Sequence, residues 1–500
     1  MHRRTFLALT PVAFAQVRWK DNPGTRAGFA EADITPDIGM EQPGGYGKSF
    51  HRTLHDPCKA RVAVFDDGSR RAAIVGLDTL IVPRKLVLDV RAAVARSTGI
   101  PAEAVLINAS HSHSSGPLGM VQPGDFDGAS ELVKVLGYEK SSAADPKYID
   151  LVRRRIVEAI EKANATRTDL LCGVGSGTED KAAFNRRFRM ANGRTFTHPG
   201  QHNADVIRPA GPIDPEVGVI GAWDREGKLT GCIVNYACHA TTNPGGISAN
   251  WVYYLERAIR GFFGPQVTVV FIQGACGDIT QVDNRYAYQQ PAGDEWAQIV
   301  GGRVGAEAVR VLLSMNRGAL TPVAYSQRVL RIPRRKPSPE RVREAFELVK
   351  KDPKEAGVTE WTFAKETVML DHLIKREPVA DVEVQAIQVG PAVFVSNPAE
   401  YFVEYGLEIK SKSRFQYTFP AELSNGCVGY VPTEEALSES GGGYETRLTY
   451  YSNLEPTAGR EIANAGIALV NCMTPGRVPE PPKAKPGTPW NYGNVPAETH

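Results

Sequence analysis

Apolar and polar positions follow two different periods along the chain, which predicts both amphipathic helices and buried strands. A period close to 3.6 residues runs through 83–98 and 145–163, where Asp145 can cap the helix and Pro146 suits its first turn. Further helices are expected at 294–315, 338–352, 359–376 and 457–472. Short Val- and Ile-rich runs predict buried strands at 72–77, 105–109, 232–238, 267–272 and 392–395. Helices mixed with buried strands indicate an α/β (mixed α+β) fold, with sheets flanked by helices.

Long Pro- and Gly-rich segments separate some of these elements, at 36–56, 117–130, 192–217 and 284–294. Segments of this length in a compact domain are usually functional loops rather than simple connectors. We expect one domain over residues 27–473, followed by an irregular, Pro-rich tail over 474–500.

The first residues have the pattern of an export signal. Arg3 and Arg4 precede an apolar stretch at 6–14, and Ala13-Phe14-Ala15 has the form of a cleavage site. The order Arg-Arg-Thr-Phe-Leu is similar to a twin-arginine signal. Residues 1–15 are therefore predicted to be a signal peptide of a periplasmic or secreted protein, with a buried N-terminal segment as the alternative. No later stretch reaches the roughly 18 apolar residues of a membrane-spanning helix.

Charge and cysteine usage argue against a nucleic-acid partner and against a zinc site built from cysteines. Lys and Arg number 58 against 56 Asp and Glu, for a net charge of +2, and no long basic stripe is present. Arg334-Arg335-Lys336 is interpreted as a short surface run, so no nucleic-acid partner is expected. The seven cysteines form no Cys-x-x-Cys pair, so a cysteine zinc site is not expected. Because their number is odd, at least one thiol is free or forms an intermolecular bond. The sequence also allows one disulfide but does not identify its two cysteines.

Polar residues with ligand chemistry follow three of the predicted strands. The strand at 105–109 leads into Ser110 and then His111-Ser112-His113, and residues two apart in an extended segment face the same side. By itself the His-x-His step also fits two solvated or capping histidines. His239 follows the strand at 232–238, and Glu400 lies just beyond the strand at 392–395. Two histidines and one glutamate with an open fourth position are a known catalytic zinc set.

A Gly-containing turn, 273–278, follows another of these strands. Its glycines allow the backbone to approach a ligand closely, so the turn could form the floor of the pocket. The alternative is a tight turn in which Asp278 accepts hydrogen bonds from nearby amides.

Seven short motifs, taken in chain order, resemble the catalytic domain of neutral ceramidases over about residues 27–472. They are Ala32-Asp-Ile-Thr-Pro36, Asn108-Ala-Ser-His-Ser-His-Ser114, Asn185-Arg-Arg187, Asp214-Pro215, Val234-Asn-Tyr-Ala-Cys-His-Ala240, Phe271-Ile-Gln-Gly-Ala-Cys-Gly-Asp278 and Gly429-Tyr-Val-Pro-Thr433. The resemblance implies one zinc ion per chain, held by His111, His239, Glu400 and Tyr430. It also implies catalytic roles for His113, Arg186, Ser248 and Tyr444.

Two departures from the family pattern bear on the substrate. The site serine of these enzymes is followed by Asp-Asn, whereas Ser248 is followed by Ala249-Asn250, which weakens the transfer of its role. The resemblance also stops before the second, immunoglobulin-like domain of these enzymes, so access to membrane lipid is expected to differ.

The resemblance implies zinc-dependent hydrolysis of an N-acyl amide in ceramide or a ceramide-like lipid, giving a fatty acid and an amine. Water activated by the zinc would attack the amide carbonyl, with Arg186 and Tyr444 stabilising the oxyanion and His113 moving the proton. Ser248 is expected to position substrate or water rather than to act as a nucleophile, because no base is adjacent to it in sequence. One alternative is a zinc hydrolase of a polar substrate, an acylated sugar or a glycoside. A second is a catalytically silent homologue that binds lipid or metal.

Overall fold

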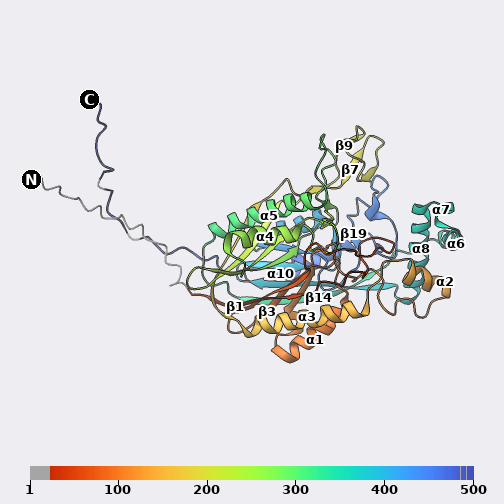
Figure 1. The fold of residues 1–500 in the computed structure, drawn as a ribbon, viewed down its shortest axis with the longest axis horizontal. Helices are drawn as coiled ribbons and strands as arrows, with labels where there is room; N and C mark the ends of the chain where they lie inside the picture. The colour runs from red at the N-terminus through yellow and green to blue at the C-terminus, as the bar shows by residue number, and fades with distance from the viewer. Residues whose placement is uncertain (1–22, 485, 491) are drawn as a thin grey trace, which may run out of the picture.

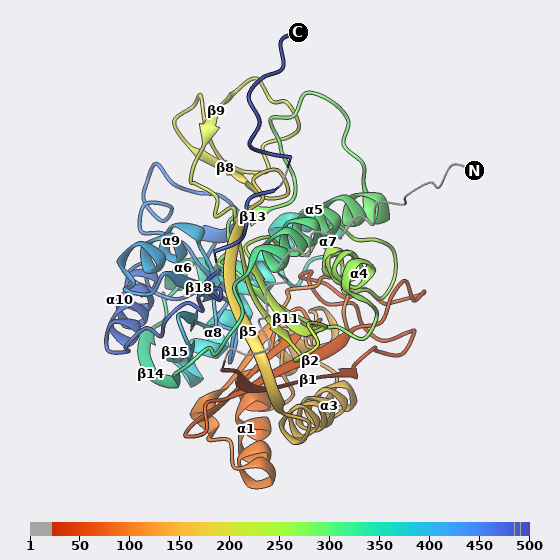
Figure 2. The same ribbon diagram turned by 90° about the vertical axis from the view of Figure 1, so that its left-hand side faces the viewer.

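The computed structural model describes residues 23–484, 486–490 and 492–500, and it has the mixed α/β fold that the sequence pattern predicts (Figures 1 and 2). The predicted signal peptide at 1–15 lies outside the described residues. In the described part of the chain, no helix combines the length and apolar character needed to cross a lipid bilayer.

The larger sheet has the strand order β12-β11-β10-β5-β1-β2-β3-β4. Its strands are β1 (Thr25–Asp33), β2 (Lys59–Asp66), β3 (Arg71–Leu77), β4 (Val105–Ala109), β5 (Thr168–Thr178), β10 (Glu216–Trp223), β11 (Leu229–Tyr236) and β12 (Thr268–Gln273). Neighbours are antiparallel except at β3–β4 and β11–β12, which are parallel pairs. Of these parallel strands, β4 and β12 are buried along their whole length, as expected for continuous apolar runs.

A smaller sheet has the order β14-β15-β16-β18. Its strands are β14 (Val323–Pro333), β15 (Val379–Val389), β16 (Ala392–Ser396) and β18 (Tyr417–Ala421). Short pairs complete the strands: β6 (Phe184–Asn185) with β13 (Ile279–Thr280), β17 (Glu400–Tyr401) with β19 (Tyr430–Val431), and β7 (Arg187–Met190) with both β8 (Thr195–Thr197) and β9 (Val206–Pro209). The segment 192–217, which was predicted to be a loop, contains the short strands β8 and β9, so the prediction is wrong for these residues.

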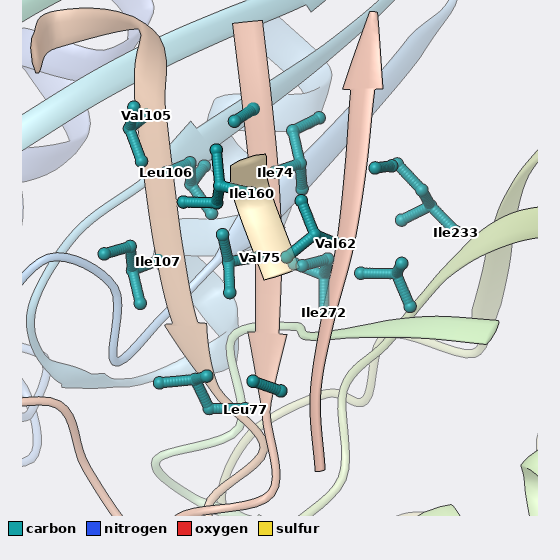
Figure 3. Close-up of a cluster of buried hydrophobic side chains, with 14 of the residues drawn as sticks. Val62, Ile74, Val75, Leu77, Val105, Leu106, Ile107, Ile160, Ile233 and Ile272 are labelled. Carbon is teal, nitrogen blue, oxygen red and sulfur yellow. The ribbon is translucent and has the colours of Figure 1, made fainter. Parts of the chain in front are cut away.

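Helices cover both sheets (Figure 2). They are α1 (Arg84–Thr98), α2 (Glu131–Lys134), α3 (Pro146–Ala165), α4 (Trp251–Phe263), α5 (Gly293–Ser314), α6 (Pro339–Leu348), α7 (Pro353–Ala356), α8 (Val358–Arg376), α9 (Val403–Lys412) and α10 (Ala458–Asn471). α3 packs on β1 and β2, α4 and α5 pack against each other and against the β5–β12 half of the large sheet, and α9 and α10 cover the small sheet. Apolar side chains from β2, β3, β4, α3, β11 and β12 form one continuous core (Figure 3).

Two buried asparagines join the ends of strands from both sheets. Asn108 of β4 accepts a hydrogen bond from the Gln273 amide of β12 at 2.8 Å and donates to the Glu422 carbonyl just beyond β18. Asn235 of β11 donates to the carbonyls of Ile272 and Pro420, at 3.0 and 2.9 Å. Since a buried amide must find partners, these bonds fix the strand ends side by side. The loops that follow those ends consequently gather at one place.

Most predicted elements are confirmed to within one or two residues at each boundary, apart from the end of the helix predicted at 338–352 and the start of the strand predicted at 232–238. α6 ends at Leu348, and β11 spans Leu229–Tyr236. The interpretation of 334–336 as a surface run is wrong for Arg334 and Arg335, which are half-buried, while Lys336 is exposed. Each of the two arginines donates to backbone carbonyls, and these bonds draw both side chains inward.

Candidate metal centre

The loop after β4 is pinned on both sides by backbone hydrogen bonds. The Ser112 amide donates to the Thr79 carbonyl at 3.1 Å, and the His113 amide donates to the Ala240 carbonyl at 3.2 Å. His111 has a φ of 61°, in the left-handed region that residues other than glycine rarely occupy. Such strain persists only where the surroundings enforce it, and it is common at functional sites. The loop therefore presents the His111 ring in a fixed direction.

Three side chains from three strand ends converge beside this loop: His111, His239 and Glu400. The Glu400 Oε2 atom lies 3.3 Å from His111 Nε2 and 3.1 Å from His239 Nε2. All three residues are at most 2% exposed, and their potential ligand atoms lie within 4.8 Å of one another. The structure thus assembles the group that the sequence predicted from the three strand ends.

The hydrogen bonds behind the two rings determine which nitrogen faces the group. His111 Nδ1 lies 2.9 Å from the Leu80 carbonyl oxygen, and His239 Nδ1 lies 2.9 Å from the Ile279 carbonyl oxygen. A carbonyl oxygen can only accept, so each Nδ1 carries the hydrogen and each neutral Nε2 presents a lone pair. Two imidazole lone pairs and a carboxylate oxygen then face one another with no donor among the three. This arrangement fits a bound cation.

The charges at the group agree with that fit. Burial opposes ionisation of Glu400, but the neighbouring histidines hold its pKa well below the usual value. Burial alone would lower the pKa of His111, yet the Glu400 carboxylate raises it. Burial, reinforced by the Arg186 guanidinium, lowers the pKa of His239 to about 4. Glu400 is therefore ionised and supplies the negative charge that a metal ion requires.

Tyr430 reaches the same group through a two-residue strand pair. β17 and β19 are parallel and place Tyr430 directly beside Glu400. The Tyr430 hydroxyl accepts a hydrogen bond from Arg186 Nη2 at 3.1 Å, and burial raises the pKa of the phenol well above its usual value. A phenol in this position needs the field of a cation to ionise. The structure therefore brings Tyr430 to the site, where its ionisation would depend on a bound ion.

Arg186 lies across the other side of the group. Its Nη1 atom is 3.3 Å from His239 Nε2, its Nε donates to Glu445 Oε1 at 2.6 Å, and its Nη2 also donates to the Gly277 carbonyl at 2.8 Å. Glu445 is fully buried and thus holds the guanidinium in one orientation. A β-carbon at Gly277 would stand 2.5 Å from the Glu400 carbonyl oxygen, so only glycine fits.

The turn that follows β12 therefore contacts Glu400 through Gly277, but it does not line the space beside His111 and Glu400, so the prediction that it forms the floor of the pocket is not confirmed. The alternative interpretation holds, because Asp278 accepts a hydrogen bond from the Val403 amide at 2.9 Å. Glu445 itself was missed by the sequence analysis, since nothing in its local sequence marks a carboxylate that orients an arginine.

A small chamber of about 30 Å³ opens beside the metal group. Its walls include His113, whose Nε2 atom lies 3.2 Å from His111 Nε2, and Tyr444, which is 38% exposed. The ring of Tyr46 meets that of Tyr444 edge-on, with centroids 6.1 Å apart. Gly44 packs so closely that a β-carbon there would lie 2.3 Å from His113 Nδ1. The segment 36–56, predicted to be functional, thus forms one wall of the chamber.

A cavity of about 600 Å³ adjoins this chamber and shares Met120 and Tyr451 with it. Apolar side chains line much of it, including Leu86, Ile149 and Leu373. Charged side chains also line it: Arg84, Lys85, Asp89, Asp125, Arg334, Arg376 and Glu377. The volume lies within the range of cavities that hold small organic ligands, roughly 300–1,000 Å³.

Ser248 lies behind the loop rather than in the chamber. Its backbone carbonyl accepts a hydrogen bond from Ser112 Oγ at 2.8 Å. Its own hydroxyl donates to Asp56 and accepts from the Asn250 amide. Asp56 also accepts from the Ala249 amide at 2.8 Å, so a carboxylate from a distant segment contacts this serine where the family has a neighbouring acid. These contacts support the 111–113 loop from behind.

Fold and site together define a mixed α/β protein with a buried His-His-Glu group suited to a metal ion at its strand ends. No family model matches the chain. A curated neutral ceramidase of Pseudomonas aeruginosa is 26% identical over 279 residues, which are 51% of this chain and 38% of that protein. The matched region thus spans well under half of this relative.

Two solved structures share the fold. A ceramidase described as complexed with C2 has a TM-score of 0.65 at 18% identity, covering 92% of this chain and 78% of its own. The neutral ceramidase of Pseudomonas aeruginosa has a TM-score of 0.64 at 19% identity, covering 93% and 77%. The predicted resemblance to neutral ceramidases is confirmed.

Proposed function

We propose that this protein is a zinc-dependent hydrolase that cleaves the N-acyl amide bond of ceramide or a ceramide-like lipid. One observation carries the proposal: two imidazole lone pairs and the Glu400 carboxylate face one another with no hydrogen-bond donor among the three groups. The likeness to neutral ceramidases supports the amide as the bond that is cleaved. The N-terminal signal-like sequence supports a periplasmic or secreted location.

The ligands proposed for the zinc ion are His111, His239, Glu400 and Tyr430. Nitrogen and oxygen donors of these types suit tetrahedral zinc, and both histidines have the backbone hydrogen bonds that fix ligand orientation. Zinc held there supplies a Lewis acid that activates water near neutral pH.

The other residues of the chamber have distinct proposed roles in the hydrolysis. His113 Nε2 lies close enough to the ligand group to accept a proton from the attacking water and return it to the leaving nitrogen. Arg186 and the Tyr444 hydroxyl supply hydrogen-bond donors for the negative charge that develops on the carbonyl oxygen. Addition of water across the C–N bond gives a carboxylate and an amine. Ser248 is proposed to position the loop that carries His111 and His113.

The two connected spaces suit an N-acyl lipid. The tyrosine-walled chamber is small enough to exclude bulk water from the ligand group, while the adjoining cavity offers apolar surface for a hydrocarbon chain. The charged side chains of that cavity also suit a polar head group. An acylated sugar or glycoside is therefore kept as a second class of substrate to be tested.

The test measures bound zinc and turnover together in matched histidine variants. His239→Ala is expected to lose both stoichiometric zinc and hydrolysis of N-acylsphingosine. His372→Ala, which removes a half-buried histidine of α8, is expected to keep both. Full activity without zinc would end this mechanism.

A substrate panel separates the alternatives. Ceramides, shorter N-acyl amines, acyl esters, acylated sugars and glycosides are compared with the zinc-loaded and the chelated protein. Turnover confined to sugars would replace the lipid proposal. Stoichiometric zinc with no turnover on any substrate would identify a silent homologue.

A further inference from the structure

A second large cavity, of about 630 Å³, lies between α6, α8 and the segment 446–448. Its lining does not include any of the proposed zinc ligands or their catalytic neighbours. Figure 1 shows α6 and α8 together at one end of the molecule. Residues 446–448 directly follow Tyr444 and Glu445, so this cavity adjoins the segment that completes the candidate metal centre.

Three guanidinium groups line this cavity: Arg335, Arg341 and Arg447. Across the described residues, none of the three is within ion-pair distance of a carboxylate, although many other arginines of this protein are. Two exposed carboxylates, Glu344 and Glu360, line the same cavity and form no ion pair with the three arginines, although the charge of Glu360 partly opposes the lowering of the Arg447 pKa by burial. Three guanidinium groups against two carboxylates leave the cavity lining with an excess of one positive charge.

Backbone carbonyls hold two of these arginines in place. Arg335 Nε donates to the Leu454 carbonyl at 2.9 Å, and Arg341 Nη2 donates to the Leu448 carbonyl at 3.2 Å. A guanidinium has five N–H donors, so several on each side chain remain for another acceptor. Arg335 is half-buried as well as hydrogen-bonded, so its side chain is ordered before any ligand arrives, which lowers the entropic cost of binding, whereas Arg341 is exposed.

The third arginine is oriented by an aromatic ring. Arg447 stacks over Phe363 of α8, with its guanidinium carbon 3.2 Å from the ring centroid. Burial lowers the pKa of both Arg335 and Arg447, because a half-buried charge loses hydration. A bound anion would stabilise the charged guanidinium groups in place of the lost hydration.

We propose that this cavity binds an oxyanion of the phosphate type carried on an organic group. Guanidinium groups match the oxygens of phosphate in bidentate geometry. Three of them, from α6, from the segment before it and from the segment 446–448, line this one cavity. The volume is within the roughly 300–1,000 Å³ range of small-ligand cavities, so there is room for more than the anion alone. A phosphate ester or the head group of an anionic phospholipid would satisfy both requirements.

Two contacts connect this cavity to the chamber beside the metal group. The Arg447 amide donates to the Tyr444 carbonyl at 3.2 Å, and Phe363 contacts Tyr46 with ring centroids 5.5 Å apart. Tyr46 and Tyr444 both line the chamber beside the metal group. An anion bound to Arg447 would therefore lie next to residues that support two walls of the chamber.

The test uses the full chain and measures thermal stabilisation by inorganic phosphate against chloride at equal ionic strength. Wild type is expected to be stabilised by phosphate, and the double variant Arg335→Met with Arg447→Met to need at least tenfold more phosphate for the same shift. Arg343→Met, on α6 but outside the cavity lining, is the matched control and should behave as wild type. His239→Ala should keep the phosphate effect, which separates this cavity from the metal centre.

Three results would overturn the proposal, and a vesicle experiment then assigns the anion to its source. Absence of a phosphate-specific shift in wild type, or an equal loss in the control, overturns the proposal. If the double variant does not fold, Arg447→Gln alone must still weaken phosphate binding, and an unchanged affinity overturns the proposal equally. Co-sedimentation with phosphatidylglycerol vesicles but not phosphatidylcholine vesicles, lost in the same variants, assigns the anion to a lipid. Stabilisation by soluble phosphate without vesicle binding assigns it to a phosphate ester.

Discussion

A buried charge cluster under α4 gives a quantitative test of the electrostatics of this fold. Glu256 of α4 is 4% exposed and accepts a hydrogen bond from Arg61, which is 2% exposed, and another from Lys59 at 2.8 Å. Arg61 also donates to Asp78 at 2.6 Å. We propose the substitution Glu256→Gln, which keeps the shape of the side chain and removes its charge.

The size of the effect follows from the pKa of this carboxyl. Burial alone would raise it, but Arg61 and Lys59 together lower the pKa of Glu256 from 4.5 to about 2. A pKa that is lowered from 4.5 to about 2 corresponds to about 3 kcal/mol of folding stability when the group is ionised. Loss of one partner from a buried ion pair costs about 3–5 kcal/mol in other proteins, which agrees in scale.

The sign of the pH dependence is also determined. A carboxyl whose pKa is lower in the folded protein stabilises the fold above its unfolded pKa of 4.5, and that contribution is lost as the pH falls towards 2. The Glu256→Gln variant should be about 3 kcal/mol less stable than wild type near pH 7. The difference should shrink steadily between pH 4.5 and 2.

Urea unfolding, followed by tryptophan fluorescence at several pH values, measures this difference. Glu161→Gln is the matched control, because Glu161 is an exposed carboxylate on α3. Its stability should track that of wild type at every pH. A Glu256→Gln variant as stable as wild type at pH 7, or a deficit that stays constant down to pH 3, would refute the electrostatic reasoning.

Three further substitutions test the metal centre. Gly277→Ala should displace Glu400, because the new β-carbon would meet the Glu400 carbonyl oxygen at 2.5 Å, so zinc content and melting temperature should both fall; retention of full zinc would contradict this packing. Glu445→Gln should leave zinc content unchanged but reduce turnover at least tenfold, since the buried Arg186 loses the charge that orients it; an unchanged kcat would remove that role. Tyr430→Phe should weaken zinc affinity by about 10-fold or more in a chelator competition, the scale seen when groups around a metal are removed; unchanged affinity would exclude Tyr430 as a ligand.

Elements with strong periodicity could be predicted from the sequence, whereas those that depend on tertiary partners could not. α1 and α3 have one apolar face, and their predicted limits agree with the structure within two residues. α4 was missed even though Trp251, Leu255 and Ile259 of its buried face recur four residues apart, which is a helical spacing. β15 was missed because polar side chains such as Gln385 and Gln388 are buried within it.

The residues of the candidate site also divide into those that could be predicted from the sequence and those that could not. His111, His239 and Glu400 could be found because each follows an apolar run that predicts a strand, and strand ends gather polar groups. Tyr430 reaches the group only because β19 pairs with β17, and no local pattern records a pairing of two-residue strands. Arg335 was misread for a related reason, since its carbonyl partner lies more than a hundred residues along the chain.

The joining of both sheets at Asn108 has a consequence for the order of folding. His111 and His239 follow strands of the large sheet, whereas Glu400 follows a strand of the small one and lies far from both along the chain. Closing such distant contacts is slow, and no nascent half of the chain contains all three ligands. Metal uptake should therefore report the last stage of refolding: tight binding would appear only when the two sheets have docked, well after the secondary structure has formed.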